Sequence, residues 1–238
     1  MKKVIGILSL ILVVSLLWTS MLAADLAWEY IYEGDILPDD PALGDDAWQL
    51  SGDNKFAEVT DNDELHIDDV GLNHCFFLYN LTDINLMQEA TIEARVKVLS
   101  QEGSANFEVL VGMQDGSHSQ WLDLFPDHIL LNSTGSTYDV DMTDYHVLRM
   151  VRDVGDIYIY VDDEEVIGEA HVGAVESWIG FIFGAGCTLC KSEQYWDYVV
   201  FTTEGGFSPE ELPSYASASS VTSKEKLSTC WGEMKSWE

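Results

Sequence analysis

The chain has 238 residues, and its 42 acidic and 11 basic residues give it a formal net charge of −31. Such a charge repels nucleic-acid phosphates and anionic lipids, so neither a nucleic acid nor an anionic membrane surface is expected as a partner. Hydrophobic residues at 47% and aromatic residues at 11% exclude a disordered chain and predict one sizeable core.

Residues 1–24 are predicted to be a secretory signal peptide. Met1-Lys2-Lys3 is a short basic start, residues 4–18 are apolar, and Ala23 and Ala24 are small residues at the exit. This pattern predicts a secreted protein, extracellular or periplasmic, with no stable membrane span after the signal is removed. An uncleaved membrane anchor is the alternative, because the position three residues before the cut is not small.

Residues 25–207 are predicted to form one all-β domain. Short runs of β-branched and aromatic residues follow one another from Trp28 to Phe207, separated by Gly, Asp and Asn, with almost no helical period. Ala90–Leu99 alternates most clearly, because aliphatic residues fall on one face and charged residues on the other. We expect the aliphatic side chains to face inward, namely Ile92, Ala94, Val96 and Val98. We expect the charged side chains to face outward, namely Glu93, Arg95 and Lys97.

The stretch Asp141–Ala170 contains three further strand-like runs separated by short turns. In the middle run, Ile157, Ile159 and Val161 share one face, while Tyr158 and Tyr160 share the other. Such period-two alternation is typical of a half-buried antiparallel strand. The pattern predicts a core on one face and aromatic rings presented on the opposite face.

About a dozen short strands without the amphipathic segments that parallel β/α folds need predict an all-β fold. The order of the motifs favours a two-sheet antiparallel jelly-roll sandwich.

Four segments also resemble the concanavalin A-like lectin/glucanase superfamily, which includes laminin G-like and pentraxin-like modules. Tyr145–Arg149, a turn and the run Ile157–Asp162 are similar to its central strands. Thr91–Val98 is similar to the strand that alternates core and charged residues, and Tyr195–Phe201 to the closing strand. The chain departs from the family at Asp163, where the tight turn usually has glycine. The resemblance implies the same jelly-roll fold.

After Phe207 the composition changes. Residues 208–223 are rich in Ser, Ala and Pro and are predicted to be a linker. In residues 224–238, apolar side chains recur at helical spacing, which predicts a short amphipathic helical tail. One interpretation is a tail that attaches the protein to a cell surface; the other is a segment that packs on its own domain.

Four cysteines, Cys75, Cys187, Cys190 and Cys230, pair in any of three ways after export. Cys187 and Cys190 form a CxxC pattern, and a bridge between them would need a turn at Thr188-Leu189. A structural disulfide or a buried thiol is preferred over redox or metal chemistry.

No segment carries the Glu-x-Asp-x-x-Glu pattern of glucanases in this superfamily, a Gly-x-Ser-x-Gly elbow or a His-Glu-x-x-His helix. A non-catalytic protein is therefore favoured, although carboxylates from distant strands remain an alternative source of catalysis.

The predicted ligand surface is a groove on the non-core face. Aromatic rings pack on the apolar faces of sugars, while Arg and His fix hydroxyl groups. His146 and Arg149 are three residues apart, so at most one of them faces the groove. In the alternative interpretation, the rings fill a second core layer. The predicted ligand-binding residues are Tyr158, Tyr160, Trp121, Arg149 and His146.

The resemblance also implies a structural calcium ion. The counterpart of Asp197 in many such domains helps to bind calcium together with N-terminal acidic groups, for which Glu33 and Asp35 are the candidates here.

Together these patterns favour a secreted, lectin-like module that binds a glycan or a glycosylated surface. A structural or adhesive surface protein is the second hypothesis, and a carbohydrate hydrolase or lyase with dispersed carboxylates is the third.

Overall fold

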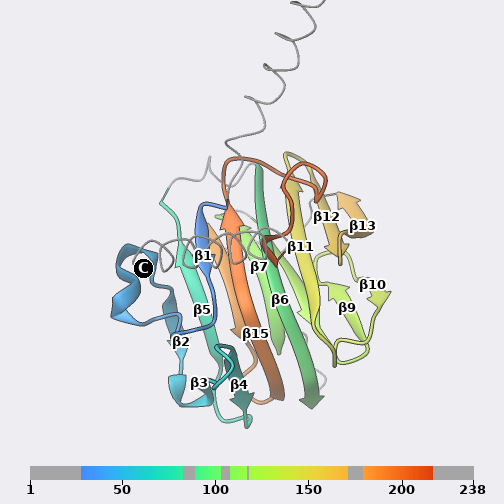
Figure 1. Cartoon of the computed structure of the whole chain (residues 1–238). Coiled ribbons are helices and arrows are strands. Elements are labelled where there is room, and N and C mark those ends of the chain that lie inside the picture. The colour runs from blue at the N-terminus through green and yellow to red at the C-terminus, as the bar shows by residue number, and fades with distance from the viewer. Residues whose placement is uncertain (1–27, 83–88, 103–107, 117, 171–178, 217–238) are drawn as a thin grey trace, which may run out of the picture.

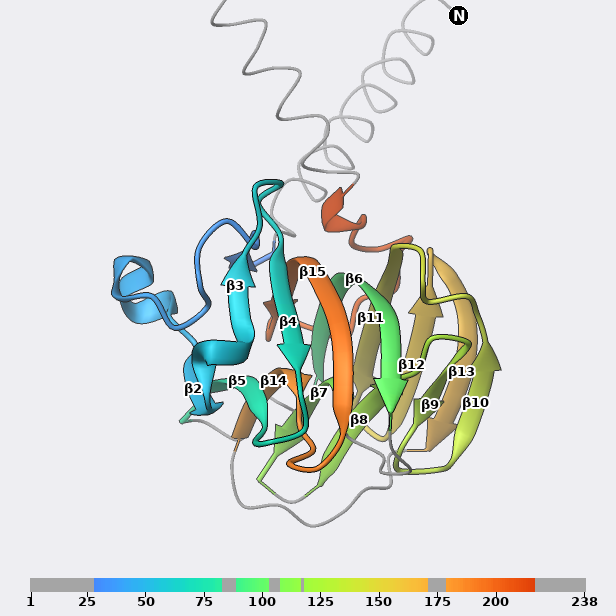
Figure 2. The ribbon, with the colours of Figure 1, turned by 90° about the horizontal axis from the view of Figure 1, so that it is seen from below.

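The computed structural model describes residues 28–82, 89–102, 108–116, 118–170 and 179–216 (Figure 1). They form two antiparallel sheets that pack face to face, as the view from below shows (Figure 2). This confirms the predicted all-β, two-sheet sandwich. The predicted signal peptide, Cys230 and the predicted helical tail lie outside the described residues.

The eight-stranded sheet has the order β13-β12-β11-β6-β15-β4-β3, and β1 pairs with β15. Its strands are β1 (Tyr30–Tyr32), β3 (Ala57–Val59), β4 (Leu65–Asp69), β6 (Glu89–Glu102), β11 (His146–Asp153), β12 (Asp156–Val161), β13 (Glu164–Ala170) and β15 (Lys191–Thr202).

The seven-stranded sheet has the order β10-β9-β8-β7-β14-β5-β2. Its strands are β2 (Gln49–Gly52), β5 (Cys75–Asn80), β7 (Val109–Asp115), β8 (Ser119–Leu124), β9 (His128–Leu131), β10 (Ser136–Asp139) and β14 (Ile179–Ala185). Short 3-10 helices at Pro41–Asp46 and Asn54–Phe56 flank β2.

The core lies between the sheets and follows the predicted alternation. The four inward residues of β6 are at most 1% exposed, and they pack against aromatic rings from both layers. The rings of Phe181 and Phe201 stack with their centroids 4.0 Å apart. Burial of each large apolar side chain contributes about 1.5–3 kcal/mol, so this interior drives the two sheets together.

A second, smaller core lies on the outer face of the eight-stranded sheet. After β15, residues 203–216 return across that face (Figure 1) and bury Leu212 against Trp28, Tyr198 and Val200. Residues 208–216 belong to the segment predicted as a linker, and within them Leu212 and Ser214 are buried. No helix in the described part of the chain is long and apolar enough to cross a membrane.

The hairpins β11–β12 and β12–β13 contain residues with left-handed backbone. Val154 has φ 50°, and Asp162 and Asp163 have φ 51° and 70°. Two-residue hairpin loops favour this conformation, for which Asn, Asp and Gly are suited. Asp163 is therefore tolerated in this turn, whereas a β-branched valine at position 154 is strained.

We predict that Val154→Asn raises the free energy of unfolding by about 1 kcal/mol, because an Asn-Gly loop adopts this turn without the valine's strain. Val154 is exposed, so little packing is lost. Urea denaturation monitored by tryptophan fluorescence measures the change. An unchanged or lower midpoint would contradict the strain argument.

Candidate functional site

Two tyrosines stand on the outer face of β12. Ile157, Ile159 and Val161 point into the core, so the alternation of the strand places Tyr158 and Tyr160 on the opposite side. Both tyrosines are partly exposed. The structure therefore confirms the predicted faces of this strand.

The neighbours of the two rings leave their surfaces accessible. Gly168 of β13 pairs with Tyr158, and a glycine adds no side chain beside that ring. The Tyr160 hydroxyl donates to Glu165 Oε2 at 3.4 Å. The carboxylate of Asp156 raises the pKa of Tyr158, and burial together with Glu165 raises the pKa of Tyr160, so both phenols stay protonated at neutral pH.

Arg149 is next to Tyr160 in the sheet register but is not available to a ligand. Its side chain is 1% exposed and forms an ion pair with the fully buried Glu93, with Nη2 to Oε2 at 2.5 Å and Nε to Oε2 at 2.9 Å. Its Nη1 donates to the Leu212 carbonyl at 2.7 Å. The predicted ligand contact by Arg149 is thus replaced by a structural ion pair beneath the returning segment.

His146 and Trp121 lie elsewhere. His146 Nδ1 is 2.6 Å from Asp162 Oδ2, and its Nε2 is 3.1 Å from the Asp141 carbonyl oxygen. Trp121 belongs to β8 of the seven-stranded sheet. The five predicted ligand-binding residues therefore do not share one groove; Tyr158 and Tyr160 are the pair that the structure brings together on one exposed face.

Two of the three predicted calcium ligands, Asp197 and Glu33, have other partners. Arg95 Nη1 donates to Asp197 Oδ2 at 2.6 Å, and the Tyr215 hydroxyl donates to Glu33. Gly34 packs against the backbone oxygen of Asp197, so the Glu33–Asp35 loop does lie beside the closing strand. An arginine at the carboxylate of Asp197 competes with a cation, so these contacts do not fit a calcium site. Calcium binding stays a prediction.

Within the described ranges, three side chains that could ligate a metal place their ligand atoms within 4.8 Å of one another: Glu108, Cys187 and Cys190. The two sulfurs of this group are bonded to each other in a disulfide, so they are not metal ligands in this state.

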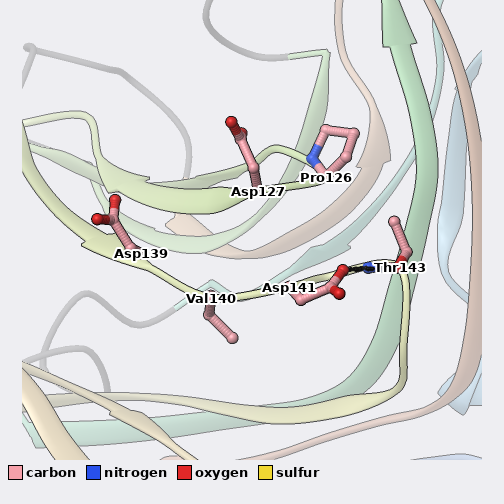
Figure 3. Close-up of a pocket in the computed structure, with 6 residues that line it drawn as sticks. All are labelled: Pro126, Asp127, Asp139, Val140, Asp141 and Thr143. Carbon is pink, nitrogen blue, oxygen red and sulfur yellow. Dashed lines mark hydrogen bonds between the residues drawn. The ribbon is translucent and has the colours of Figure 1, made fainter.

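An open pocket of about 690 Å³ lies where the loop before β9 meets the loop before β11 (Figure 3). Asp141 accepts hydrogen bonds from Thr143, with Oγ1 at 2.5 Å and the backbone nitrogen at 3.2 Å. Composition and motif spacing did not identify this pocket, because it depends on the pairing of β9 with β10, which brings Asp139 next to His128 and the loop before β9 next to the segment after β10. Its lining residues are Pro126, Asp127, Asp139, Val140, Asp141 and Thr143.

Two acids of this pocket are held in the ionised form. His128 Nδ1 lies 2.7 Å from Asp127 Oδ1, and this hydrogen bond lowers the pKa of Asp127. The hydrogen bonds from Thr143 lower the pKa of Asp141. Ionised carboxylates accept hydrogen bonds from hydroxyl groups, whereas a general acid must carry a proton.

No family model matches the sequence, and no curated protein matches it. Solved structures do match the fold. One, described with the endo-acting O-glycanases that prominent members of the human gut microbiota express to initiate mucin breakdown, has a TM-score of 0.51 and 13% identity over 74% of this chain and 99% of that chain.

Two further structures are similar. The alginate lyase AlgAT5 from polysaccharide lyase family 7 has a TM-score of 0.49 and 14% identity over 66% of this chain and 85% of its own. The binding domain of botulinum neurotoxin DC, in complex with SialylT, has a TM-score of 0.48 and 4% identity over 68% of this chain and 44% of its own. At such identities the likeness shows the fold alone, the jelly-roll sandwich that the resemblance implied.

We predict that Glu93→Gln lowers the free energy of unfolding by about 3–5 kcal/mol, because it leaves the Arg149 guanidinium buried without its counter-charge. Glu102→Gln is the control: Glu102 pairs with Lys191 in an exposed ion pair, which contributes at most about 1 kcal/mol. Urea denaturation compares the two. Equal unfolding midpoints would show that the Glu93–Arg149 pair is not structurally important.

Proposed function

We propose that this protein is a carbohydrate-binding module whose ligand surface is the tyrosine pair Tyr158 and Tyr160. The observation that carries the proposal is their position: two partly exposed rings, two residues apart on the outer face of β12, with a glycine beside the first. Residues spaced by two along a strand are roughly 6.5–7 Å apart, so one extended oligosaccharide can contact both rings.

The charge of the surroundings selects the class of glycan. The pKa of Tyr158 is raised by the carboxylates of Asp156, Asp153 and Glu165. The pKa of Tyr160 is raised in part by the carboxylates of Glu165 and Glu211, so negative charges lie near both rings. Together with a net charge of −31, this field opposes sulfated, sialylated or uronic-acid chains. We therefore propose a neutral or amino-sugar glycan as the ligand.

The fold supports this proposal in general terms. The structure with a TM-score of 0.51 is described with enzymes that initiate mucin breakdown. A sandwich of this kind is therefore compatible with a glycan ligand, although function depends on the site and not on the fold.

Carbohydrate cleavage at the acidic pocket is the second candidate, favoured by the three aspartates that line one cavity. Glycoside hydrolysis needs one protonated carboxyl group together with one ionised one. The lowered pKa values of Asp127 and Asp141 favour two ionised groups. The pocket is thus better suited to accept hydrogen bonds from hydroxyl groups, and we prefer binding over cleavage.

We also propose that the protein works outside the cytoplasm. The apolar run after Lys3 supports export, and the disulfide Cys187–Cys190 is stable in an oxidising compartment.

We predict that Tyr158→Ala and Tyr160→Ala each weaken binding of a neutral oligosaccharide by about 2- to 12-fold, because each removes one ring contact of roughly 0.5–1.5 kcal/mol. A glycan array identifies the oligosaccharide, and calorimetry measures its Kd. Tyr158→Phe keeps the ring and is expected to keep the affinity. Tyr195→Ala removes a tyrosine on β15 of the same sheet and serves as the matched control.

The outcomes separate the hypotheses. If Asp127→Asn and Asp139→Asn abolish binding while both tyrosine variants bind normally, the ligand surface is the pocket and the proposal is wrong. Turnover of an oligosaccharide that is lost on either aspartate substitution would show an enzyme. Absence of binding to every neutral glycan would favour a structural or adhesive role.

A further inference from the structure

A disulfide closes the turn between β14 and β15. Cys187 and Cys190 are bridged with their Cα atoms 5.5 Å apart, and the turn at Thr188-Leu189 is the one that the CxxC spacing requires. The two cysteines differ in exposure, because Cys187 is partly exposed whereas Cys190 is buried. An incoming thiol therefore reaches the sulfur of Cys187 first.

A buried carboxyl group lies beside this disulfide. Glu108, immediately before β7, is 0% exposed, and one of its oxygens lies within 4.8 Å of both sulfurs. The Gly186 amide donates to the Glu108 carbonyl at 3.0 Å and fixes the backbone next to Cys187. Neither side-chain oxygen makes a hydrogen bond of ordinary geometry within the described residues.

The surroundings keep Glu108 protonated. Burial raises the pKa of Glu108 to about 8, the nearby Ser192 hydroxyl opposes the shift, and Asp69 adds to it. Asp69 is itself buried, and its own pKa is raised by that burial. The neighbouring thiol of Cys75 is also buried, with its pKa raised to about 12, so it remains an unreactive thiol.

We infer that the Cys187–Cys190 disulfide is a thiol–disulfide exchange site in which the Glu108 carboxyl group donates a proton to Cys190. Three features of the turn suit this exchange: a partly exposed cysteine, a buried cysteine and a buried acid next to both sulfurs.

A substrate thiolate attacks Cys187 Sγ, the bond between Cys187 and Cys190 breaks, and a mixed disulfide forms with Cys187. Cys190 leaves as a thiolate and takes the proton of Glu108, which becomes a carboxylate. A second thiolate of the same substrate attacks its own sulfur in the mixed disulfide and releases Cys187. The dithiol substrate is oxidised to a disulfide, and the two cysteines receive its two electrons.

The rim of the site indicates the substrate class. Leu189 in the turn is 86% exposed, and the adjoining loop exposes Leu72 at 70% and Val70 at 46%. Gly71 of that loop packs against the Cys190 carbonyl oxygen, so the loop that carries Val70 and Leu72 lies beside the disulfide turn. An apolar rim on a strongly acidic protein favours a neutral or basic polypeptide segment that carries two thiols over an anionic small thiol.

Trapping tests the identity of the attacked sulfur. In a Cys230→Ser background, the variant Cys190→Ser retains the accessible thiol, and Cys187→Ser retains the buried one. Each is incubated with a synthetic, uncharged apolar peptide that contains an internal disulfide, and the mixed disulfide is quantified by mass spectrometry. We expect at least tenfold more adduct with Cys190→Ser. Equal adduct, or more with Cys187→Ser, would overturn the proposal.

A pH profile tests the role of Glu108. The oxidised full-length protein reacts with the reduced form of the same peptide, and the rate is measured from pH 5 to 9. We expect Glu108→Gln to lower the rate about tenfold or more at pH 6–7, with the difference vanishing above pH 8, where Glu108 is ionised. The exposed substitution Glu102→Gln is expected to change nothing. Equal rates for wild type and Glu108→Gln across the range would overturn the assignment.

The pH dependence of the free energy of unfolding tests independently whether Glu108 is protonated in the folded protein. Because the folded state holds a proton on Glu108 that the unfolded chain loses near pH 4.5, the folded form is favoured at low pH. This group alone makes the unfolding equilibrium constant rise by up to tenfold per pH unit between about 4.5 and 8. Relative to Glu108→Gln, the wild type should lose stability over that window. A constant difference between the two proteins would show that Glu108 is ionised throughout and contradict its role as proton donor.

Discussion

The ion pair of Glu93 and Arg149 is the interaction on which the outer face of the eight-stranded sheet depends. Removing two charges from water costs several kcal/mol per ion unless further hydrogen bonds compensate. The Glu93 carboxylate accepts hydrogen bonds from Arg149, the Tyr198 and Ser214 hydroxyls and the Tyr215 amide. The Arg149 guanidinium also donates hydrogen bonds to the carbonyls of Phe207 and Leu212. Four of these partners belong to residues 207–215. The pair is therefore satisfied when that segment lies on the sheet, and the segment is held there by the pair.

This arrangement determines which part of the sheet meets solvent. The returning segment covers the middle strands, where Val200 and Tyr198 join Leu212 in the second core. Tyr158 and Tyr160 lie on β12, next to the terminal strand β13, and remain partly exposed. The proposed glycan surface thus occupies the margin of a face whose centre is closed. The disulfide with Glu108 lies apart from it, where β14 passes to β15, so the two proposed activities use different residues.

Local periodicity predicted much of the fold, whereas the contacts made by returning segments were not predictable. The faces of Ile157, Tyr158 and the alternating residues of β6 follow from period-two geometry, and the hairpin turns follow from loop length. The same alternation placed Glu93 on the outer face and allowed either Arg149 or His146 there, but it did not show that residues 207–215 would bury Glu93 and Arg149. Local periodicity does not reveal which strands are neighbours, so Trp121 was predicted to lie with the tyrosines. Long-range strand pairing places its strand, β8, in the other sheet. The sequence did not indicate that Glu108 meets the CxxC pattern. Glu108 and Gly186 are 78 positions apart in the chain, yet the Gly186 amide donates a hydrogen bond to the Glu108 carbonyl.

Amide hydrogen exchange of residues 205–216, compared between wild type and Glu93→Gln by mass spectrometry, tests the central claim most directly. If the buried ion pair holds the segment on the sheet, the Tyr215 amide and its neighbours are protected in the wild type. They should exchange at least about tenfold faster in the variant, and they should do so at labelling times at which β7 and β14 of the opposite sheet have not yet exchanged. Exchange of this segment at the rate of an unstructured peptide in the wild type would contradict the account.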